Sequence, residues 1–304
     1  MAALRAGAVA AVVALVTACA ATPVSPQPNP PPSAFRQTDL PFTGLQNPHG
    51  IAVNAAGDVY LTDLRKTKDS NGFSGFDSVI LELAAGSGPQ ISLPFTHSEV
   101  TADADGNVWV IDSAHEQLVR LAGTQQPSTV LPLPSLGQRS EIQAIDTDAA
   151  VYGTAGGGAD PSGACCLPVH LVKSAAGVQP PTVLPFRELN WVGGVAVNAA
   201  HDVYVGDSDH DRIVLLTNGS NAPKVLPFHR VTRVVDVAVD TLGNVYAVDA
   251  DSKQVLKLAA GSDVPSVLPF TGLDRPVSVA VDSGANVYVV DAGARRVVKL
   301  AASS

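Results

Sequence analysis

A short motif, Leu-Pro-Phe or a close variant, recurs along the chain at intervals of 38 to 53 residues. Between copies the same order of short apolar segments returns, separated by Gly, Asn, Asp and Ser. Segments of this length with alternating polarity predict β-strands, and each repeat contains four of them. A repeat of about 40 residues with four strands predicts one blade of a β-propeller. The copies begin at Leu40, Leu93, Leu131, Leu184, Leu226 and Leu268.

The hexapeptide Leu-Pro-Phe-Thr-Gly-Leu occurs twice, at 40–45 and at 268–273. The last repeat reaches Ser304 without a Leu-Pro-Phe segment, whereas the first copy precedes every other strand of the repeat. We therefore expect residues 40–45 to be the outer strand of the sixth blade. Proline suits this position because it cannot donate a hydrogen bond to an inner ladder. The prediction is an all-β, six-bladed propeller of four-stranded blades over residues 38–304, closed by an N-terminal outer strand.

The first residues are typical of an export signal. Arg5 precedes an unbroken run of small and apolar residues that stops at Val16-Thr17-Ala18-Cys19. Such a segment is too short for a membrane-spanning helix and predicts a secretory signal over residues 1–18. It resembles a bacterial lipoprotein signal, which implies lipid on the Cys19 thiol. Ordinary secretion, with no role for Cys19, is the alternative.

A proline-rich segment, residues 19–37, follows the signal. Its prolines favour an extended polyproline II conformation and predict a tether without packed structure. With lipid on Cys19, the protein would be exported and held on the outer face of the cell membrane, in the cell envelope.

Composition narrows the possible partners. The formal net charge is −9, and charged residues make up only 15% of the chain against 46% hydrophobic residues. An acidic chain without basic runs is a poor ligand for nucleic acid, which leaves an envelope protein, a glycan or a small molecule as the expected partner.

The units beginning Pro-His-Gly-Ile-Ala-Val-Asn (48–54) and Val-Ala-Val-Asp (237–240) resemble NHL repeats. With Val-Leu-Pro-Phe-Thr-Gly-Leu between blades, they are also similar to the extracellular sensor propellers of mycobacterial receptor Ser/Thr kinases. The resemblance covers residues 38–304 and is weakest in the third repeat. It implies a sensor or scaffold without a cofactor. Kinase motifs are missing, since His229-Arg230 is followed by Val231 and not by the Asp of a catalytic loop.

Two sets of residues recur in register and are expected to be structural. One aromatic residue per repeat would pack between neighbouring sheets, with a stacking ladder for bases or sugars as the alternative. The Asp that closes each second strand would cap a turn through backbone N–H groups, with metal binding as the alternative. These sets are Tyr60, Trp109, Tyr152, Tyr204, Tyr246 and Tyr288, and Asp63, Asp112, Asp207, Asp249 and Asp291.

The connections before each inner strand and after each second strand depart most from the repeat, at 64–78, 155–168, 187–194 and 229–236. Binding residues usually lie in loops whose sequences differ from repeat to repeat while the strands stay similar. Loop sequences also diverge without any functional reason. We expect a ligand or partner to bind this variable loop face, with Trp191 and the Arg/His residues as anchors. The candidates are His49, His97, Arg187, Trp191, His210, His229, Arg230, Arg233 and Arg275.

Two further hypotheses remain open. Because some related six-bladed propellers are lyases or lactonases with an axial metal, the alternative function is a metal-assisted lyase or lactonase-type hydrolase. The residues at the starts of the inner strands offer weak ligands for it: His49, Glu99, Glu141 and Asp236. Cys165 and Cys166 are adjacent and form either a redox-sensitive vicinal disulfide or a pair of thiols.

Overall fold

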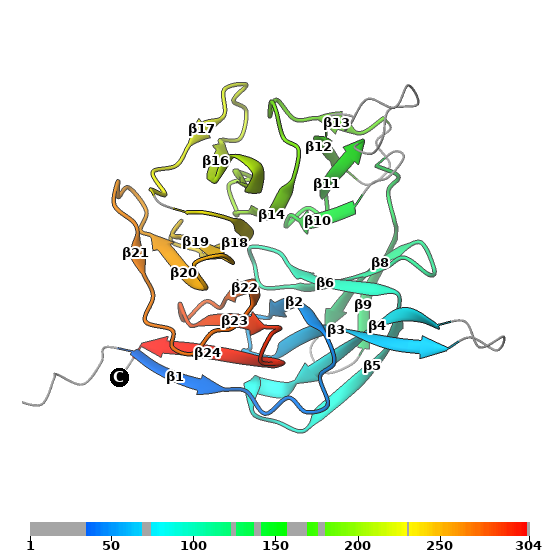
Figure 1. Cartoon of the computed structure of the whole chain (residues 1–304). Helices are drawn as coiled ribbons and strands as arrows, with labels where there is room; N and C mark the ends of the chain where they lie inside the picture. Colours follow the sequence, from blue (N-terminus) through cyan, green and yellow to red (C-terminus); the bar gives the residue numbers. More distant parts are fainter. Residues whose placement is uncertain are drawn as a thin grey trace, which may run out of the picture. The chain divides into compact units, whose positions relative to one another are not determined.

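The protein is described by a computed structural model, and six four-stranded antiparallel sheets make up a six-bladed β-propeller. Figure 1 shows the innermost strand of every sheet around the centre of the ring. The structure describes residues 35–68, 74–122, 126–136, 141–156, 169–175, 180–229 and 231–302. Cys19, Cys165, Cys166 and Arg230 lie outside these residues.

In the first three blades the strands follow chain order from the centre outward. Blade 1 contains β2 (Pro48–Val53), β3 (Val59–Lys68), β4 (Ser74–Leu83) and β5 (Gln90–Thr96), with a 3-10 turn, η1 (Ala84–Gly86), before β5. Blade 2 contains β6 (Ser98–Ala102), β7 (Val108–Asp112), β8 (Gln117–Ala122) and β9 (Gln126–Pro132). Blade 3 contains β10 (Glu141–Ile145), β11 (Val151–Gly156), β12 (Val169–Ser174) and β13 (Thr182–Val183).

Blades 4 and 5 repeat this order, and blade 6 takes its outer strand from the N-terminal side of the chain. Blade 4 contains β14 (Val192–Val197), β15 (Val203–Asp207), β16 (Arg212–Leu216) and β17 (Lys224–Val225), with η2 (Ser208–His210) after β15. Blade 5 contains β18 (Val234–Val239), β19 (Val245–Asp249), β20 (Gln254–Leu258) and β21 (Ser266–Val267). Blade 6 contains β22 (Pro276–Val281), β23 (Val287–Asp291), β24 (Arg296–Ala302) and β1 (Phe35–Asp39).

The predicted closure is confirmed, but the closing strand lies earlier in the chain than expected. β1 pairs with β24 from Phe35↔Ala302 to Asp39↔Val298, so the pairing involves residues 35–39 and not 40–45. Leu40 donates the last hydrogen bond, to the Val297 carbonyl at 2.9 Å, and a tight turn follows in which the Phe42 N–H reaches the Leu40 carbonyl at 2.8 Å. Pro41 has no N–H and ends the ladder. In blade 6 the motif marks the exit from the outer strand, and residues 35–37 of the predicted tether belong to the ring.

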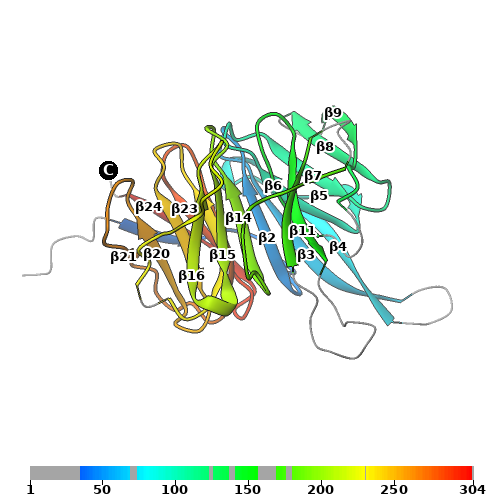
Figure 2. The same cartoon turned by 90° about the horizontal axis from the view of Figure 1, so that it is seen from above.

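The segment 64–78, expected to be a loop, forms mostly a hairpin. β3 and β4 are ten residues long and pair from Val59↔Leu83 to Lys68↔Ser74. Figure 2 shows this hairpin extending past the neighbouring sheets. The Asp77 carboxylate accepts a hydrogen bond from the His97 N–H at 2.8 Å, which ties the base of the hairpin to the start of blade 2.

Hydrophobic residues pack between neighbouring sheets, as the aromatic repeat position predicts. Tyr60 of blade 1 packs with Val100 and Val108 of blade 2, and Tyr246 of blade 5 packs with Val279 of blade 6. Leu40 and Leu45, which follow the closing strand, are buried in the cluster shared by blades 6 and 1. Burial of these side chains stabilises the contacts between blades by roughly 25 cal/mol per Å² of apolar surface.

The same aromatics carry a polar contact at their tips. In five blades this is a hydrogen bond with the Asn or Asp that ends the inner strand; for example, Tyr288 donates to Asp282 at 2.8 Å and Trp109 to Asp103 at 3.0 Å. Where that residue is Asp, a cation also lies over the ring, as Lys299 does over Tyr288, with 5.0 Å between Nζ and the ring centroid. The aromatics are therefore structural, and the alternative of a stacking ladder is wrong for these buried rings.

Four of the Asp residues at the ends of the second strands, Asp63, Asp112, Asp249 and Asp291, cap backbone N–H groups, as predicted. Asp207 instead accepts from the side chains of His210 and Arg212 among the described residues. All five are buried. Asp63 accepts the N–H groups of Gln46 and Asn47, and Asp291 accepts those of Asp274 and Arg275. These bonds hold the connection that leads into the inner strand.

Among the described residues, no helix has the length and apolar character needed to cross a membrane.

Candidate functional site

The inner strands line a central cavity of about 750 Å³. Because all six inner strands run in the same direction along the axis, their first residues meet at one mouth and their last residues at the other. His49, Glu99, Glu141 and Asp236 all line the cavity near the first mouth, which we call the loop-side mouth. The structure thus brings together the four residues predicted as weak axial ligands.

His49 and Glu99 form an ion pair that joins blades 1 and 2. Nε2 of His49 lies 2.9 Å from Oε1 and 3.1 Å from Oε2 of Glu99. Burial alone would lower the pKa of His49, but the hydrogen bond and the negative charge of Glu99 outweigh it and raise that pKa. The pair therefore favours a protonated imidazole, which is a poor metal ligand.

Glu141 lies near the same pair and has a different environment. Burial and then the charge of Glu99 raise the pKa of its carboxyl. No described residue forms a hydrogen bond or ion pair with this carboxylate. Glu141 is therefore the carboxylate of the loop-side mouth that is open to a ligand.

Asp236 is occupied by neighbours in the protein. Its Oδ2 accepts hydrogen bonds from Ser278 Oγ at 2.7 Å and from the Val279 N–H at 2.9 Å, and Oδ1 accepts the Val237 N–H at 2.8 Å. Burial raises its pKa to about 6 despite these donors. Asp236 therefore links blades 5 and 6, and the described residues of the mouth form no ring of free metal ligands.

Trp191 is the most exposed aromatic of the described residues, with 68% of its surface accessible. It precedes β14, and its carbonyl accepts the Ser208 N–H at 3.1 Å. The Ser208 hydroxyl in turn donates to the Val234 carbonyl. These bonds hold Trp191, η2 and the start of β18, beside Arg233, in one arrangement on the rim of the loop-side mouth.

The other candidates lie at separate points of the variable loop face. Arg275 donates to the Asn47 side chain at 3.1 Å, two residues from His49. Arg233 lies 3.5 Å from Asp251, His210 lies 3.0 Å from Asp207, and His97 lies 3.3 Å from Asp77. His229 is exposed. These residues form several local ion pairs and not one cationic cluster.

Arg187 lies apart from them, in a groove between blades 3 and 4. The groove has a volume of about 580 Å³. Its walls combine the outer-strand residues Val183 and Val225 with Arg187 and Arg212. Arg187 therefore belongs to the outer side of the ring.

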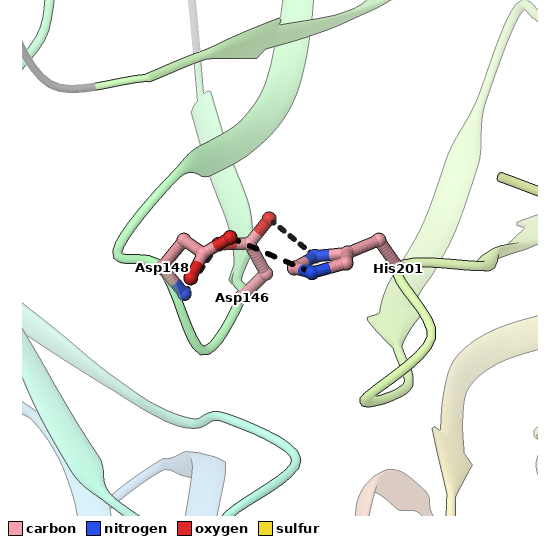
Figure 3. A group of neighbouring side chains, drawn as sticks. All are labelled: Asp146, Asp148 and His201. Carbon is pink, nitrogen blue, oxygen red and sulfur yellow. Dashed lines mark hydrogen bonds and ion pairs between the residues drawn. The ribbon is translucent and has the colours of Figure 1, made fainter. Parts of the chain in front are cut away.

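A cluster that the repeat pattern does not predict lies at the turns at the other ends of the inner strands (Figure 3). Nδ1 of His201 is 3.2 Å from Oδ2 of Asp146, and its Nε2 is 3.5 Å from Oδ2 of Asp148. These ligand atoms lie within 4.8 Å of one another, so the group has the spacing of a metal site. The signal in the sequence is His201 itself, which takes the left-handed turn position (φ 62°) where Gly57 and Gly243 stand in other repeats.

The surroundings of the cluster favour an ionic bridge. Burial alone would raise the pKa of Asp146, but hydrogen bonds from the Ala150 N–H, Lys173 and Tyr152 hold it below its usual range. Lys173 places a cation 3.1 Å from the same carboxylate. Each ring nitrogen of His201, in blade 4, faces a carboxylate of blade 3. The cluster therefore links blades 3 and 4, and Lys173 occupies a position beside Asp146 that a metal ion would share.

Comparison with known proteins identifies the fold but assigns the chain to no family. No protein-family model matches the chain, and no curated protein is significantly similar to it. A catalytically inactive virginiamycin B lyase from Staphylococcus aureus, solved with quinupristin, is 12% identical with a TM-score of 0.53, over 88% of this chain and 99% of that one. A gluconolactonase from Xanthomonas campestris is 13% identical with a TM-score of 0.61, over 88% and 90%. A luciferin-regenerating enzyme is 12% identical with a TM-score of 0.61, over 88% and 95%.

These likenesses define the class of protein as a six-bladed β-propeller. At such low identity they carry the fold alone, because one propeller scaffold supports unrelated functions. The assignment to NHL repeats stays a prediction.

Proposed function

We propose that the chain is a non-catalytic envelope lipoprotein of the NHL type, whose propeller binds a protein, a glycan or a small ligand on its variable loop face. In this role the protein would be lipid-anchored through Cys19 on the outer face of the cell membrane. The ring would act as a rigid scaffold that displays the loops, and the individual connections would select the ligand.

The exposed side chain of Trp191 carries this proposal. Large aromatic residues supply much of the binding energy of interfaces, and Trp is among the residue types enriched at the points that contribute most. The bond from the Ser208 N–H to the Trp191 carbonyl fixes the backbone that presents the side chain. A Trp side chain has only two rotatable bonds, so it loses little conformational entropy on binding, which favours recognition.

The geometry of the loop-side mouth supports binding over catalysis. One imidazole is paired with Glu99, and one of the carboxylates, Asp236, is saturated by donors from the protein. A metal-assisted lyase or lactonase would need several free ligands around one point.

Affinity capture from envelope extracts with a fragment beginning at residue 35 tests the proposal. We expect Trp191→Ala to weaken capture of the bound species by at least tenfold. Leu242→Ala is the matched control, since Leu242 is 73% exposed but lies on a turn at the other ends of the inner strands. Equal capture by the wild type and the Trp191 variant would contradict the proposal. A stoichiometric metal lost on His49→Ala would instead support the lyase or lactonase alternative.

A further inference from the structure

Trp191 is an isolated apolar side chain on the loop-side face of blade 4. It is exposed, and the described residues of the connections around it, 186–190, 208–211 and 231–233, expose no other large hydrophobic side chain. An aromatic anchor in a protein interface usually lies within an apolar patch whose rim excludes water. The lone ring of Trp191 therefore indicates a ligand that needs one flat apolar contact with polar contacts around it.

Three connections of the chain meet near this ring. The Ser208 N–H donates to the Trp191 carbonyl at 3.1 Å, so η2 lies opposite Trp191. A Cβ atom at Gly193 would lie 2.6 Å from Ser208 Oγ and 2.8 Å from the carbonyl carbon of Val234. The absence of a side chain at Gly193 thus lets the start of β18 pack against the same turn. Trp191, η2 and the first residues of blade 5 therefore occupy one surface.

His210 of η2 is held in one orientation. Its Nδ1 lies 3.0 Å from both carboxylate oxygens of the buried Asp207, which also accepts from Nε of Arg212 at 2.8 Å. A carboxylate only accepts, so Nδ1 carries the hydrogen and the imidazole plane is fixed. Nε2 forms no hydrogen bond with a described residue, and the His210 side chain is 36% exposed. A ligand hydroxyl both donates and accepts, so it can bond Nε2 whether or not that nitrogen carries a hydrogen.

Blade 2 shows which part of this arrangement is common to the repeat. His115 occupies the position of His210, and its Nδ1 lies 2.8 Å from Oδ2 of Asp112. The paired imidazole is therefore a feature of two blades and is not by itself evidence of a ligand. The residue before the inner strand is His97 in blade 2 and Trp191 in blade 4. What distinguishes blade 4 is an exposed aromatic ring opposite the turn that carries the paired imidazole.

We propose that the surface formed by Trp191 and η2 binds a neutral glycan. A sugar ring would stack on the Trp191 indole, because the C–H groups of its flat face carry partial positive charge and the face of the indole is negative. Its hydroxyls would bond Nε2 of His210 and the Asp209 carboxylate, which is exposed and forms no hydrogen bond or ion pair with a described residue. Asp209 and Asp211, both exposed, would repel an anionic sugar. This site rests on the proposed function and names its ligand.

The open shape of the surface suits a polymer better than a single small molecule. Drug-sized ligands are usually buried in a cleft, and Trp191 lines neither the central cavity nor the groove between blades 3 and 4. A glycan chain can bind an open surface because several linked sugar units contribute weak contacts together. The shape of the site therefore favours a chain of sugars.

Affinity capture from envelope extracts with the full-length protein tests the glycan site, with the extract divided into three portions. One portion is untreated, one is oxidised with periodate, which cleaves the vicinal diols of sugars, and one is digested with protease. We expect periodate to reduce capture by at least tenfold and protease to leave it unchanged. Trp191→Ala and His210→Ala should each reduce capture from the untreated extract by at least tenfold.

His115→Ala is the matched control for His210→Ala. It removes the same Asp-paired imidazole from a blade that has no exposed Trp, so capture should stay at the wild-type level. Melting curves of the three variants, compared with the wild type, verify that the fold is intact. A loss of capture in His115→Ala equal to that in His210→Ala would overturn the role of His210 in binding the glycan.

The outcomes separate this inference from the function on which it rests. Capture that depends on Trp191 but is lost on protease digestion would overturn the glycan and leave a protein as the partner. Capture that depends on Trp191 and survives both treatments would overturn it in favour of a small ligand. Capture without any dependence on Trp191 would contradict the proposed function and the glycan site together.

Discussion

Arg296 of β24 donates from Nη1 to both carboxylate oxygens of Asp39, at 3.2 and 3.1 Å, although the two residues are 257 positions apart in the chain. Its Nη2 also reaches the carbonyl of Gly272, at 2.6 Å. Gln37 of β1 bonds the Thr271 backbone in both directions. The closing strand therefore joins β24 and also the second copy of the repeated hexapeptide, residues 268–273.

Removal of this strand should open the ring. A chain that begins at residue 40 loses several backbone hydrogen bonds and the Arg296–Asp39 pair, together about 4 kcal/mol. We expect its melting temperature to fall by about 10 °C relative to a chain that begins at residue 35. Circular dichroism of the two truncations measures the difference. Equal melting temperatures would show that β1 does not hold the ring closed.

Gly193 permits the close approach of blades 4 and 5. A Cβ atom there would collide with the Val234 carbonyl oxygen and lie 2.8 Å from its carbon, both of which are backbone atoms that cannot turn aside. We expect Gly193→Ala to lower the free energy of unfolding by about 3 kcal/mol, measured by denaturant titration. Gly75→Ala is the control, since among the described residues its Cβ would meet only Thr67 Oγ1, at 3.7 Å. A loss no larger than that of the control would mean that the blades can shift at little cost.

The order of strands was predictable because each repeat contains segments of alternating apolar and polar residues, turn residues between them and one Leu-Pro-Phe motif. Closure of the ring was predictable because the last repeat has no Leu-Pro-Phe motif, whereas the first copy of the motif precedes the first complete repeat. The position of the closing strand was not, since Leu-Pro-Phe occurs both within a strand, at 93–95, and after one, at 40–42. Proline at an edge is compatible with both arrangements.

The site was less predictable than the fold. Sequence position placed His49 and Glu99 at the starts of inner strands, but their pairing depends on the angle between two blades. Gly50 also packs closely against Thr62 of the adjacent strand and Glu99 of the next blade, since a Cβ atom there would lie 3.3 and 3.4 Å from their side-chain oxygens. Such features come from packing between elements, which a repeat pattern does not specify.

The pKa of Asp236 should be visible in the stability of the protein. Burial raises that pKa from 3.8 to about 6, so the folded state holds the proton more tightly than the unfolded chain. The resulting stabilisation is fully present below pH 3.8 and is lost as the pH rises through about 6. Asp236→Asn is neutral throughout and should not show this loss.

Between about pH 4 and about pH 7, wild-type protein should therefore lose about 2–3 kcal/mol of unfolding free energy relative to Asp236→Asn. Guanidinium titrations at the two pH values measure the change. Asp274→Asn, at an exposed position, should show no comparable trend against the wild type. A difference between wild type and Asp236→Asn that is independent of pH would show that Asp236 ionises equally easily in the folded and unfolded states.

Asp240 shows how one carboxylate can hold a turn and an aromatic together. It accepts the N–H groups of Leu242 and Asn244, the Asn244 amide and the Tyr246 hydroxyl at 2.9 Å. Asp240→Ala leaves all four donors without this acceptor, and we expect a loss of about 3 kcal/mol of unfolding free energy. Tyr246→Phe removes one bond and should cost about 1 kcal/mol.

A double-mutant cycle separates the two contributions. With Asp240 absent, the Tyr246 hydroxyl has lost its acceptor, so Tyr246→Phe should then cost little and the coupling should be about 1 kcal/mol. Denaturant unfolding of the two single variants and the double variant gives this value. Purely additive losses would mean that the Tyr246 hydroxyl is stabilised by a group other than Asp240.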